Sequence, residues 1–396
     1  MSGWPAAGAC FTISVVVVVS MLVLQMDARG TSIQPHIPIE LYTPFAPRPF
    51  EGSDGKAHLA YEVHITNFYR DTGAIVLEEL QIAHRTPGTR LVELDAADLD
   101  ERVKHPGAEA ENLYGRSIEG GMRAVVHIWV TLQPDAATPE SLLHRLVFTT
   151  TDGTEQYVEG LVDVRDDPAV RIGSPLRKGI WFISGGPGDH TGHWGSVHMS
   201  NGRAIVAQRF AIDVVGLDEN GVAAIGDIDR TTNEDFFGFG AEVIAVADGI
   251  VRASRDGVSD RPPLAQLTPP SELTLDAVAG NYVVLELGTN TFALYAHFQR
   301  DSVAVQAGQR VRRGDILGRL GNSGNTSGPH LHFHISDAPG LDGEGLPFVI
   351  DSFDVLGETT ANNVLAEWSG AEPFELAPEA DRRSGLPLDG VVFRIP

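Results

Sequence analysis

Short runs of β-branched and aromatic residues, partly alternating with polar positions, fill the first half of the chain. The clearest lie at residues 58–68 (HLAYEVHITNF), 74–84, 123–132 and 142–150, each separated from the next by Gly, Pro, Asp or Asn. A period of two between turn residues is typical of half-buried strands. Only residues 96–103 (AADLDERV) have a helical pattern. The pattern predicts an antiparallel, immunoglobulin-like β-sandwich over residues 31–170.

A second series of strand-like segments follows the acidic, Pro-containing stretch RDDPAVRIGSP. We expect residues 171–195 to hold the rest of this linker and one leading strand, and residues 196–351 to form a second all-β domain. Two long inserts, at 218–240 and 259–280, are expected to be solvated loops that rim a site. After residue 351 the chain becomes acidic and irregular, so residues 352–396 are interpreted as a C-terminal extension.

Three histidines alternate in the segment GNSGNTSGPHLHFHI, residues 321–335: His330, His332 and His334. Side chains at every second position of a strand share a face, so the three imidazoles form a row backed by apolar residues. From this pattern alone, the row is compatible with metal binding, with proton transfer or with simple exposure to water.

One apolar run, at residues 11–24, precedes the predicted sandwich. At 14 residues it is shorter than a membrane span, which favours a secretory signal peptide over residues 1–30, cleaved after Gly30. Since no Lys or Arg precedes the run, an uncleaved membrane tether is the alternative. Either interpretation predicts an exported protein located in the periplasm, the cell envelope or outside the cell.

The composition narrows the chemistry of any site. The single cysteine, Cys10, precedes the apolar run, so an exported chain has no thiol for disulfides or for metal binding. A transition-metal site must then use His, Asp or Glu, a donor set that suits zinc. The formal net charge of −24 argues against a nucleic acid partner, because binding a polyanion needs clustered Lys and Arg. The oligomeric state is not indicated.

The motifs AxVxAxxDGxV, NYVVLE, YAHF and VxxGxxVxxGxxLGxxGNSGNTSGPHLHF occur in this order over roughly residues 195–350. Together they resemble the lysostaphin-type (LytM-like) zinc endopeptidases, which cut peptide cross-links in bacterial cell walls. The resemblance implies an antiparallel, duplicated hybrid motif-like sheet, a Zn²⁺ cofactor and peptidoglycan peptides as substrate. Motif by motif, it implies Asp213 and His332 as zinc ligands and His297 and His330 as the catalytic pair.

Two positions depart from the family pattern. His334 follows HLHF where the family often has Glu, so it is expected either to support His332 or to be a half-exposed strand residue. Arg209 stands four residues before Asp213, where the family has its first ligand. A guanidinium has no lone pair for a metal, so a third ligand must come from elsewhere or the site is inactive.

The segment upstream of Arg209 offers three further histidines, His190, His193 and His198. The pair Asn201-Gly202 predicts a hairpin that folds this segment back along the Asp213 strand. Such a hairpin pairs His198 with Ile205 and places His193 opposite Phe210 and His190 opposite Asp213.

A less secure resemblance, to a branch of the family in which GH followed by QRFAID replaces HxxxD, favours His193 as the third ligand. His190, His198 or the absence of a third protein ligand are the alternatives. Arg209 is expected either to contact an oxyanion or a substrate carboxylate, or to form a surface or interdomain salt bridge.

The sequence therefore predicts an exported zinc metalloendopeptidase that hydrolyses peptide bonds of peptidoglycan cross-links. The alternative is a catalytically inactive homologue that binds cell-wall peptide or regulates a partner hydrolase.

Overall fold

The structure is a computed structural model that describes residues 37–85, 89–106, 108, 115–134, 136–189, 192–269, 272–378 and 381–396. The predicted signal or tether segment, residues 1–30, and His190 lie outside the described residues. Within these ranges, no helix is both long and apolar enough to cross a membrane. Residues Ile39–Pro396 make up one compact unit.

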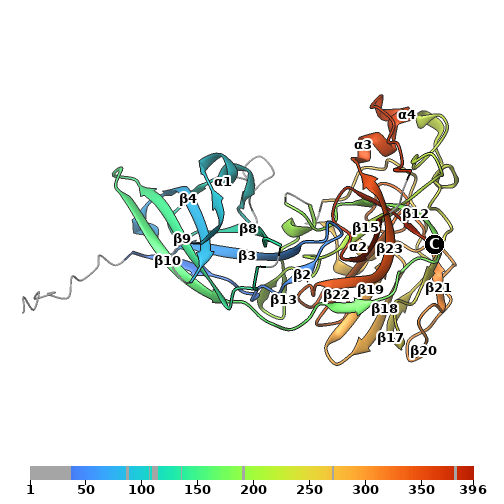
Figure 1. Cartoon of the computed structure of the whole chain (residues 1–396), viewed down its shortest axis with the longest axis horizontal. Helices are drawn as coiled ribbons and strands as arrows, with labels where there is room; N and C mark the ends of the chain where they lie inside the picture. Colours follow the sequence, from blue (N-terminus) through green and yellow to red (C-terminus); the bar gives the residue numbers. More distant parts are fainter. Residues whose placement is uncertain are drawn as a thin grey trace, which may run out of the picture. The chain divides into compact units, whose positions relative to one another are not determined.

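Two five-stranded antiparallel sheets form the N-terminal region (Figure 1). The first sheet has the order β1-β3-β8-β6 with β2 beside β3, and the second has the order β10-β9-β4-β5 with β7 beside β4. Their bounds are β1 (Ile39–Tyr42), β2 (Phe50–Glu51), β3 (Ala57–Asn67), β6 (Val103–Lys104), β8 (Arg123–Thr131), β4 (Ile75–His84), β5 (Arg90–Leu94), β7 (Ser117–Ile118), β9 (Ser141–Thr150) and β10 (Glu155–Asp163).

The four strands predicted from alternation correspond to β3, β4, β8 and β9, and the helical pattern corresponds to α1 (Ala96–Arg102). Asp95 caps α1 through its side chain, which accepts hydrogen bonds from the N–H groups of Ala97 and Asp98. The two sheets face each other, because Tyr61 on β3 and His144 on β9 share a buried hydrogen bond of 2.8 Å. The prediction of a β-sandwich is confirmed.

An eleven-stranded sheet forms the second region, in the order β11-β23-β25-β12-β15-β22-β19-β18-β17-β20 with β24 beside β23. All its pairings are antiparallel except β11 with β23. The strands are β11 (Val170–Ile172), β12 (Gly179–Ser184), β15 (Ile212–Leu217), β17 (Gly249–Arg255), β18 (Tyr282–Gly288), β19 (Thr291–Ala296), β20 (Arg310–Val311), β22 (Leu331–Ser336), β23 (Phe348–Glu358), β24 (Asp381–Gly385) and β25 (Val391–Ile395).

Two short ribbons complete the second region, β13 (His198–Ser200) with β14 (Arg203–Ile205) and β16 (Glu242–Ile244) with β21 (Ile316–Arg319). Its short helices are η3 (Gly192–Gly195), η4 (Ile228–Arg230), η5 (Asn233–Asp235), α2 (Leu275–Ala279), α3 (Ala361–Val364) and α4 (Ala366–Ser369), and η1 (Arg70–Thr72) lies in the sandwich. The prediction of two all-β regions is therefore confirmed.

The C-terminal residues are more regular than their sequence indicates. Strand β23 continues past residue 351 to Glu358, and β25 lies between β23 and β12. The expectation of an irregular extension is therefore wrong for these strands. They complete the side of the sheet that leads to β15.

The Asn201-Gly202 hairpin is present, and both residues have positive φ angles, 50° and 76°, as a type I′ turn requires. His198 pairs with Ile205 as predicted. The ladder ends there, however, and the strand opposite Asp213 is β12, through Ser184. The predicted register that places His190 opposite Asp213 and His193 opposite Phe210 is wrong, because β12 arrives from further upstream and takes the edge of β15.

Candidate active site

Three adjacent strands at the centre of the large sheet bring the predicted site residues together. Strand β22 lies between β15 and β19, and all six of its residues are buried. In this register His332 is opposite Asp213 on one side and Ala296 on the other. His297 directly follows Ala296, so the predicted ligands and the predicted catalytic residues reach the same end of the sheet.

A chain of hydrogen bonds orients the His332 ring. Its Nε2 lies 3.0 Å from Nδ1 of His334, and Nε2 of His334 lies 3.2 Å from the carbonyl oxygen of Gly340. A carbonyl oxygen only accepts, so Nε2–H of a neutral His334 donates to it and Nδ1 of His334 accepts from Nε2–H of His332. A neutral His332 then keeps its lone pair on Nδ1, which lies 2.8 Å from Oδ1 of Asp213.

His334 is fully buried, so the half-exposed alternative does not hold. Burial lowers the pKa of His334 to about 3, which keeps the ring neutral near pH 7. Burial also lowers the pKa of His332. The structure therefore places His334 behind His332, as a partner that selects the tautomer of His332.

His193 reaches the same carboxylate from a different segment. It lies in the short helix η3, and its Nδ1–H donates to the carbonyl oxygen of Gly185. Its Nε2, which carries the lone pair, is 3.5 Å from Oδ2 of Asp213. Gly185 has a φ of 65°, and a Cβ there would lie 3.3 Å from the His193 ring, so glycine suits this close approach.

The donor atoms of His193, Asp213 and His332 lie within 4.8 Å of one another. Among the alternatives, His198 lies outside this group, because its two ring nitrogens face the carbonyl oxygens of Ser196 and Leu341. Of the described histidines upstream of Arg209, the structure thus brings His193 to the predicted ligands.

His297 and His330, like His193, are each oriented by a hydrogen bond from Nδ1–H to a backbone carbonyl oxygen. Nδ1–H of His297 donates to the carbonyl oxygen of Ser323 over 2.7 Å, and Nδ1–H of His330 donates to that of Gly328 over 2.9 Å. Each neutral ring therefore keeps its lone pair on Nε2. The ring centroids are 4.7 Å apart, and Nε2 of His330 is 3.5 Å from Asp213. His297 has a φ of 65°, an unfavourable conformation typical of functional sites.

Buried polar residues around these histidines were not identified from the sequence. Asn281 donates through Nδ2 to the carbonyl oxygen of Phe298, and the hydroxyl of Ser323 donates to that same oxygen. Asn322 and Ser323 are fully buried although they belong to the polar loop NSGNTSGP. A signal was available, since polar residues packed between glycines directly before the histidine row are suited to hold backbone carbonyls in place.

The pKa values of the pocket residues are shifted by burial and by the short distances between Asp213 and the histidines. Burial alone would raise the pKa of Asp213, but the nearby His193 and His330 hold that pKa well below its usual range. Burial tends to lower the pKa of His330, yet Asp213 raises it overall. For His297 burial dominates, and its pKa lies well below the ordinary value.

Arg209 points away from this pocket. Its guanidinium is fully buried and donates to Glu62 on β3 over 2.7 to 3.1 Å and to Glu344 over 2.8 Å. Burial opposes its charge, but Glu62 and Glu344 raise the pKa of Arg209. The geometry corrects the expectation of a substrate or oxyanion contact, because the guanidinium has no exposed surface, and it matches the interdomain salt bridge.

The arrangement around Asp213 is suited to a cation. The lone pairs of His193 Nε2, His330 Nε2 and His332 Nδ1 all face the Asp213 carboxylate, at 2.8 to 3.5 Å. Acceptors that converge in this way repel one another unless a proton or a metal ion lies among them. Two imidazoles and one carboxylate form the ligand set of many catalytic metal sites. The residues present therefore fit a metal ion.

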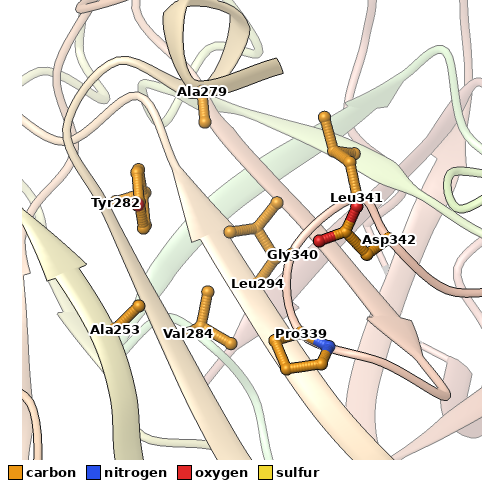
Figure 2. Close-up of a pocket in the computed structure, with 9 residues that line it drawn as sticks. All are labelled: Ala253, Ala279, Tyr282, Val284, Leu294, Pro339, Gly340, Leu341 and Asp342. Carbon is orange, nitrogen blue, oxygen red and sulfur yellow. The ribbon is translucent and has the colours of Figure 1, made fainter. Parts of the chain in front are cut away.

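A pocket of about 240 Å³ opens over this group. It is lined by His193, Gln208, Asp213, Leu267, Val278, Ala279, Leu294, Ala296, His297, Asn325, Thr326, Ser327, His330, His332 and Leu341. A neighbouring apolar pocket of about 170 Å³ shares Ala279, Leu294 and Leu341 with it. Figure 2 shows this second pocket between the side chains of Tyr282 and Val284 and the loop that carries Leu341.

A third pocket of about 250 Å³ shares Asp213, Ser327 and His330 with the pocket over His193, Asp213 and His332. Its other lining residues come from β12, from β15, from the two long inserts, from the loop before β22 and from helix α3 with the following Leu365. The second and third pockets therefore each adjoin the pocket that contains His193, Asp213 and His332.

Comparison with known proteins identifies a family match and several similar proteins. Residues 233–342 match the model of Peptidase family M23, a range that includes the three histidines of the row and His297 and leaves Asp213 and His193 outside. Over 57 residues the chain is 42% identical to peptidoglycan DD-endopeptidase ShyA of Vibrio cholerae serotype O1, covering 14% of this chain and 13% of the relative. Over 94 residues it is 31% identical to ShyC of the same organism, covering 24% and 19%.

The chain thus spans less than a fifth of the length of these curated relatives. Among solved structures, a zinc-containing peptidase from Vibrio cholerae aligns with a TM-score of 0.26 and 15% identity, over 78% of this chain and 83% of that chain. The motifs and the family match agree, and residues 233–342 are matched as a LytM-type domain of Peptidase family M23, a family of metallopeptidases.

Proposed function

We propose that the protein is a zinc metalloendopeptidase that hydrolyses peptide bonds in peptidoglycan cross-links. The observation that carries the proposal is the grouping of His193, Asp213 and His332, whose donor atoms lie within 4.8 Å of one another. The alternative of an inactive homologue rested on Arg209 in the usual first-ligand position. His193 supplies a third donor without Arg209, which supports an active site.

Zinc suits this donor set, which combines two imidazole nitrogens with one carboxylate and leaves a coordination position for water. When bound, the zinc ion supplies Lewis-acid activation of water and of the scissile carbonyl. His332 would bind through Nδ1, His193 through Nε2 and Asp213 through its carboxylate. The tautomers of both imidazoles are already selected by their other nitrogens, through His334 and Gly185.

His330 and His297 carry the proton transfers of the proposed reaction. As the water oxygen adds to the carbonyl carbon, an Nε2 lone pair of one of these rings accepts the proton that water loses. As the carbon–nitrogen bond breaks, that proton passes to the leaving amine. Both rings are available for this step because their Nδ1–H groups are bound to the carbonyls of Ser323 and Gly328.

An extended peptide fits the three adjoining pockets. The pocket in Figure 2 adjoins the pocket over the proposed metal ligands through Ala279, Leu294 and Leu341. The pocket lined by Phe182, Phe236 and Leu365 adjoins it through Asp213, Ser327 and His330. Residues on both sides of a scissile bond could then be held at once, as peptide hydrolysis requires. The named activity of ShyA and ShyC, peptidoglycan DD-endopeptidase, supports cell-wall peptides as the substrate class.

The proposal includes export to the cell envelope or beyond, where peptidoglycan is found. Residues 1–30 would act as the signal peptide or as a membrane tether. A nucleic acid partner is not part of the proposal, given the formal net charge of −24.

Metal analysis of the purified full chain tests the metal. We expect about one zinc ion per chain, as one catalytic site requires, and its loss in the His193→Ala variant. A wild-type protein that takes up no zinc at neutral pH would refute the zinc-dependent mechanism.

Digestion of purified cell walls tests the reaction. Wild type should release peptide fragments, and His330→Ala should release at least about a hundredfold less, the usual scale for loss of a general acid or base. His84→Ala, a change on β4 of the sandwich, serves as the control and should match wild type. Equal release by wild type and His330→Ala removes the proposed role of His330, and a zinc-loaded wild type without release supports the inactive homologue.

A further inference from the structure

The loop that carries His193 packs against the β-sandwich. Trp194, the residue after His193, is 3% exposed. Its indole ring lies 5.5 Å from the ring of His127 and 5.7 Å from that of Trp129, measured between centroids. His127 and Trp129 both belong to β8 of the sandwich. The residue next to the predicted ligand is thus held by side chains of the other domain.

A second group of contacts holds the same loop at both ends. Arg102, the last residue of α1, forms a two-bond ion pair with Asp189, four residues before His193. The ammonium group of Lys104 on β6 lies directly against Gly195. Helix α1 and strand β6 belong to the sandwich, so three of its elements contact the segment between residues 189 and 195.

Arg209 also connects the sandwich to the site, at the start of the strand that carries Asp213. It precedes the Asp213 strand and is bound to Glu62 of β3 by a fully buried ion pair. The position that carries a metal ligand in related enzymes therefore holds the sandwich in place here. The ligand that replaces it, His193, lies on a segment that the sandwich supports.

We propose that the β-sandwich is a positioning domain for the metal site, in which Trp194 and Arg102 keep His193 directed at Asp213. The inference rests on the proposed zinc site and concerns how the ligand is held. Among the described residues, the ring of His193 forms one hydrogen bond, from Nδ1–H to the carbonyl oxygen of Gly185. The packing of Trp194 restricts the conformations of the short helix η3, so less conformational entropy is lost when His193 binds the metal.

Linkage makes the effect reciprocal. If docking of the sandwich strengthens zinc binding by a given factor, zinc strengthens docking by the same factor. The metal affinity then depends in part on a surface formed by β8, α1 and β6, which are far in sequence from the histidine row on β22. Displacement of the sandwich would weaken the site without any change in its ligands.

Equilibrium zinc titration of the full chain against a competing chelator tests the proposal. Trp194→Ala is expected to weaken the zinc Kd about 10- to 100-fold, the range found when groups that orient a metal ligand are removed. Trp194→Phe, which keeps a ring between His127 and Trp129, should recover most of this loss. Trp368→Ala removes a tryptophan that packs on Phe236 instead, and it should leave the Kd unchanged.

A double-mutant cycle separates positioning from general loss of structure. His193→Ala is expected to lose its zinc on purification, but residual weak binding by Asp213 and His332 can still be titrated directly with excess zinc. In this background Trp194→Ala should cause no further change in the residual zinc Kd, because the ligand through which Trp194 acts is gone. Equal effects in both backgrounds would overturn the proposal, and so would an unchanged Kd for Trp194→Ala in the wild-type background. A wild type without zinc affinity would instead contradict the proposed function on which the inference rests.

An ion-pair exchange gives a second measurement on a milder change. Arg102→Asp should weaken the zinc Kd, and the combination Arg102→Asp with Asp189→Arg should restore it. Arg123→Asp, which removes an exposed pair with Glu40 inside the sandwich, is the matched control and should leave the Kd unchanged. Equal effects of Arg102→Asp and Arg123→Asp would overturn the role of Arg102.

Discussion

Replacement of Arg209 by methionine removes a cation that is buried between two carboxylates. The side chains of Arg209, Glu62 and Glu344 are 0%, 1% and 7% exposed. Four of the guanidinium contacts go to carboxylate oxygens at 2.7 to 3.1 Å. After the change, both carboxylates remain in a site that water does not reach, and one must take up a proton or the domains must separate.

Breaking a buried pair by removal of one partner costs about 3 to 5 kcal/mol of stability. Arg209→Met is therefore expected to lower the free energy of unfolding by about that amount, measured by urea denaturation at neutral pH. Arg123→Met is the control, since its pair with Glu40 is exposed and should contribute less than about 1 kcal/mol.

A compensated variant checks the cause of the loss. When all three charges are removed in Arg209→Met, Glu62→Leu and Glu344→Gln together, most of the stability should return, because no buried charge is left unpaired. A loss for Arg209→Met no larger than for Arg123→Met would refute the reasoning, as would a triple variant less stable than Arg209→Met alone.

Three further predictions concern histidines. Arg209→His restores an imidazole at the family's first-ligand position, but position 209 faces Glu62, so zinc titration should show no tighter Kd; a gain in affinity would contradict the described geometry. His334→Ala removes the acceptor that keeps the lone pair of His332 on Nδ1, so the zinc Kd should weaken about 10- to 100-fold, and an unchanged Kd would exclude this role. Burial lowers the pKa of His144 to about 4. As the pH falls below about 6.5, this histidine is protonated in the unfolded chain but stays neutral in the folded protein, so the folded state loses stability. The loss continues to about pH 4 and amounts to about 3 kcal/mol in full. Urea denaturation at pH 7 and pH 5 should show a smaller pH-dependent loss for His144→Phe than for wild type, and equal losses would contradict the assignment.

Local patterns in the sequence were sufficient for most strands. Residues 142–150 alternate between buried and half-buried side chains, and residues 58–68 combine β-branched and aromatic residues with partial alternation in the sequence. Both patterns are properties of the strand itself. The Asn201-Gly202 turn was predictable for the same reason, since two consecutive residues with positive φ are needed there. Strands β24 and β25 were missed, because acidic and Gly-rich neighbours hide segments whose pairing partners are distant in sequence.

The site was predictable to the extent that its residues share motifs. The HxH row, His297 and Asp213 come from short segments with a family pattern, and the structure brings them to one pocket. His193 was selected from the sequence, but the hairpin register used to place it was wrong, since β12 occupies the edge of β15. Glu62 could not be identified as the partner of Arg209, because a contact across 147 positions leaves no local trace.

Strand β25 carries a consequence for the order of assembly. It lies between β23 and β12, and β12 pairs with the strand of Asp213. A chain that emerges from its N-terminus therefore presents His193, Asp213 and the histidine row before residues 391–395 can close the sheet beside them. Pairings between distant segments form late in folding. The proposed metal site therefore gains this neighbouring part of its sheet only after residues 391–395 have been made, so we expect the geometry of the site to mature late in synthesis.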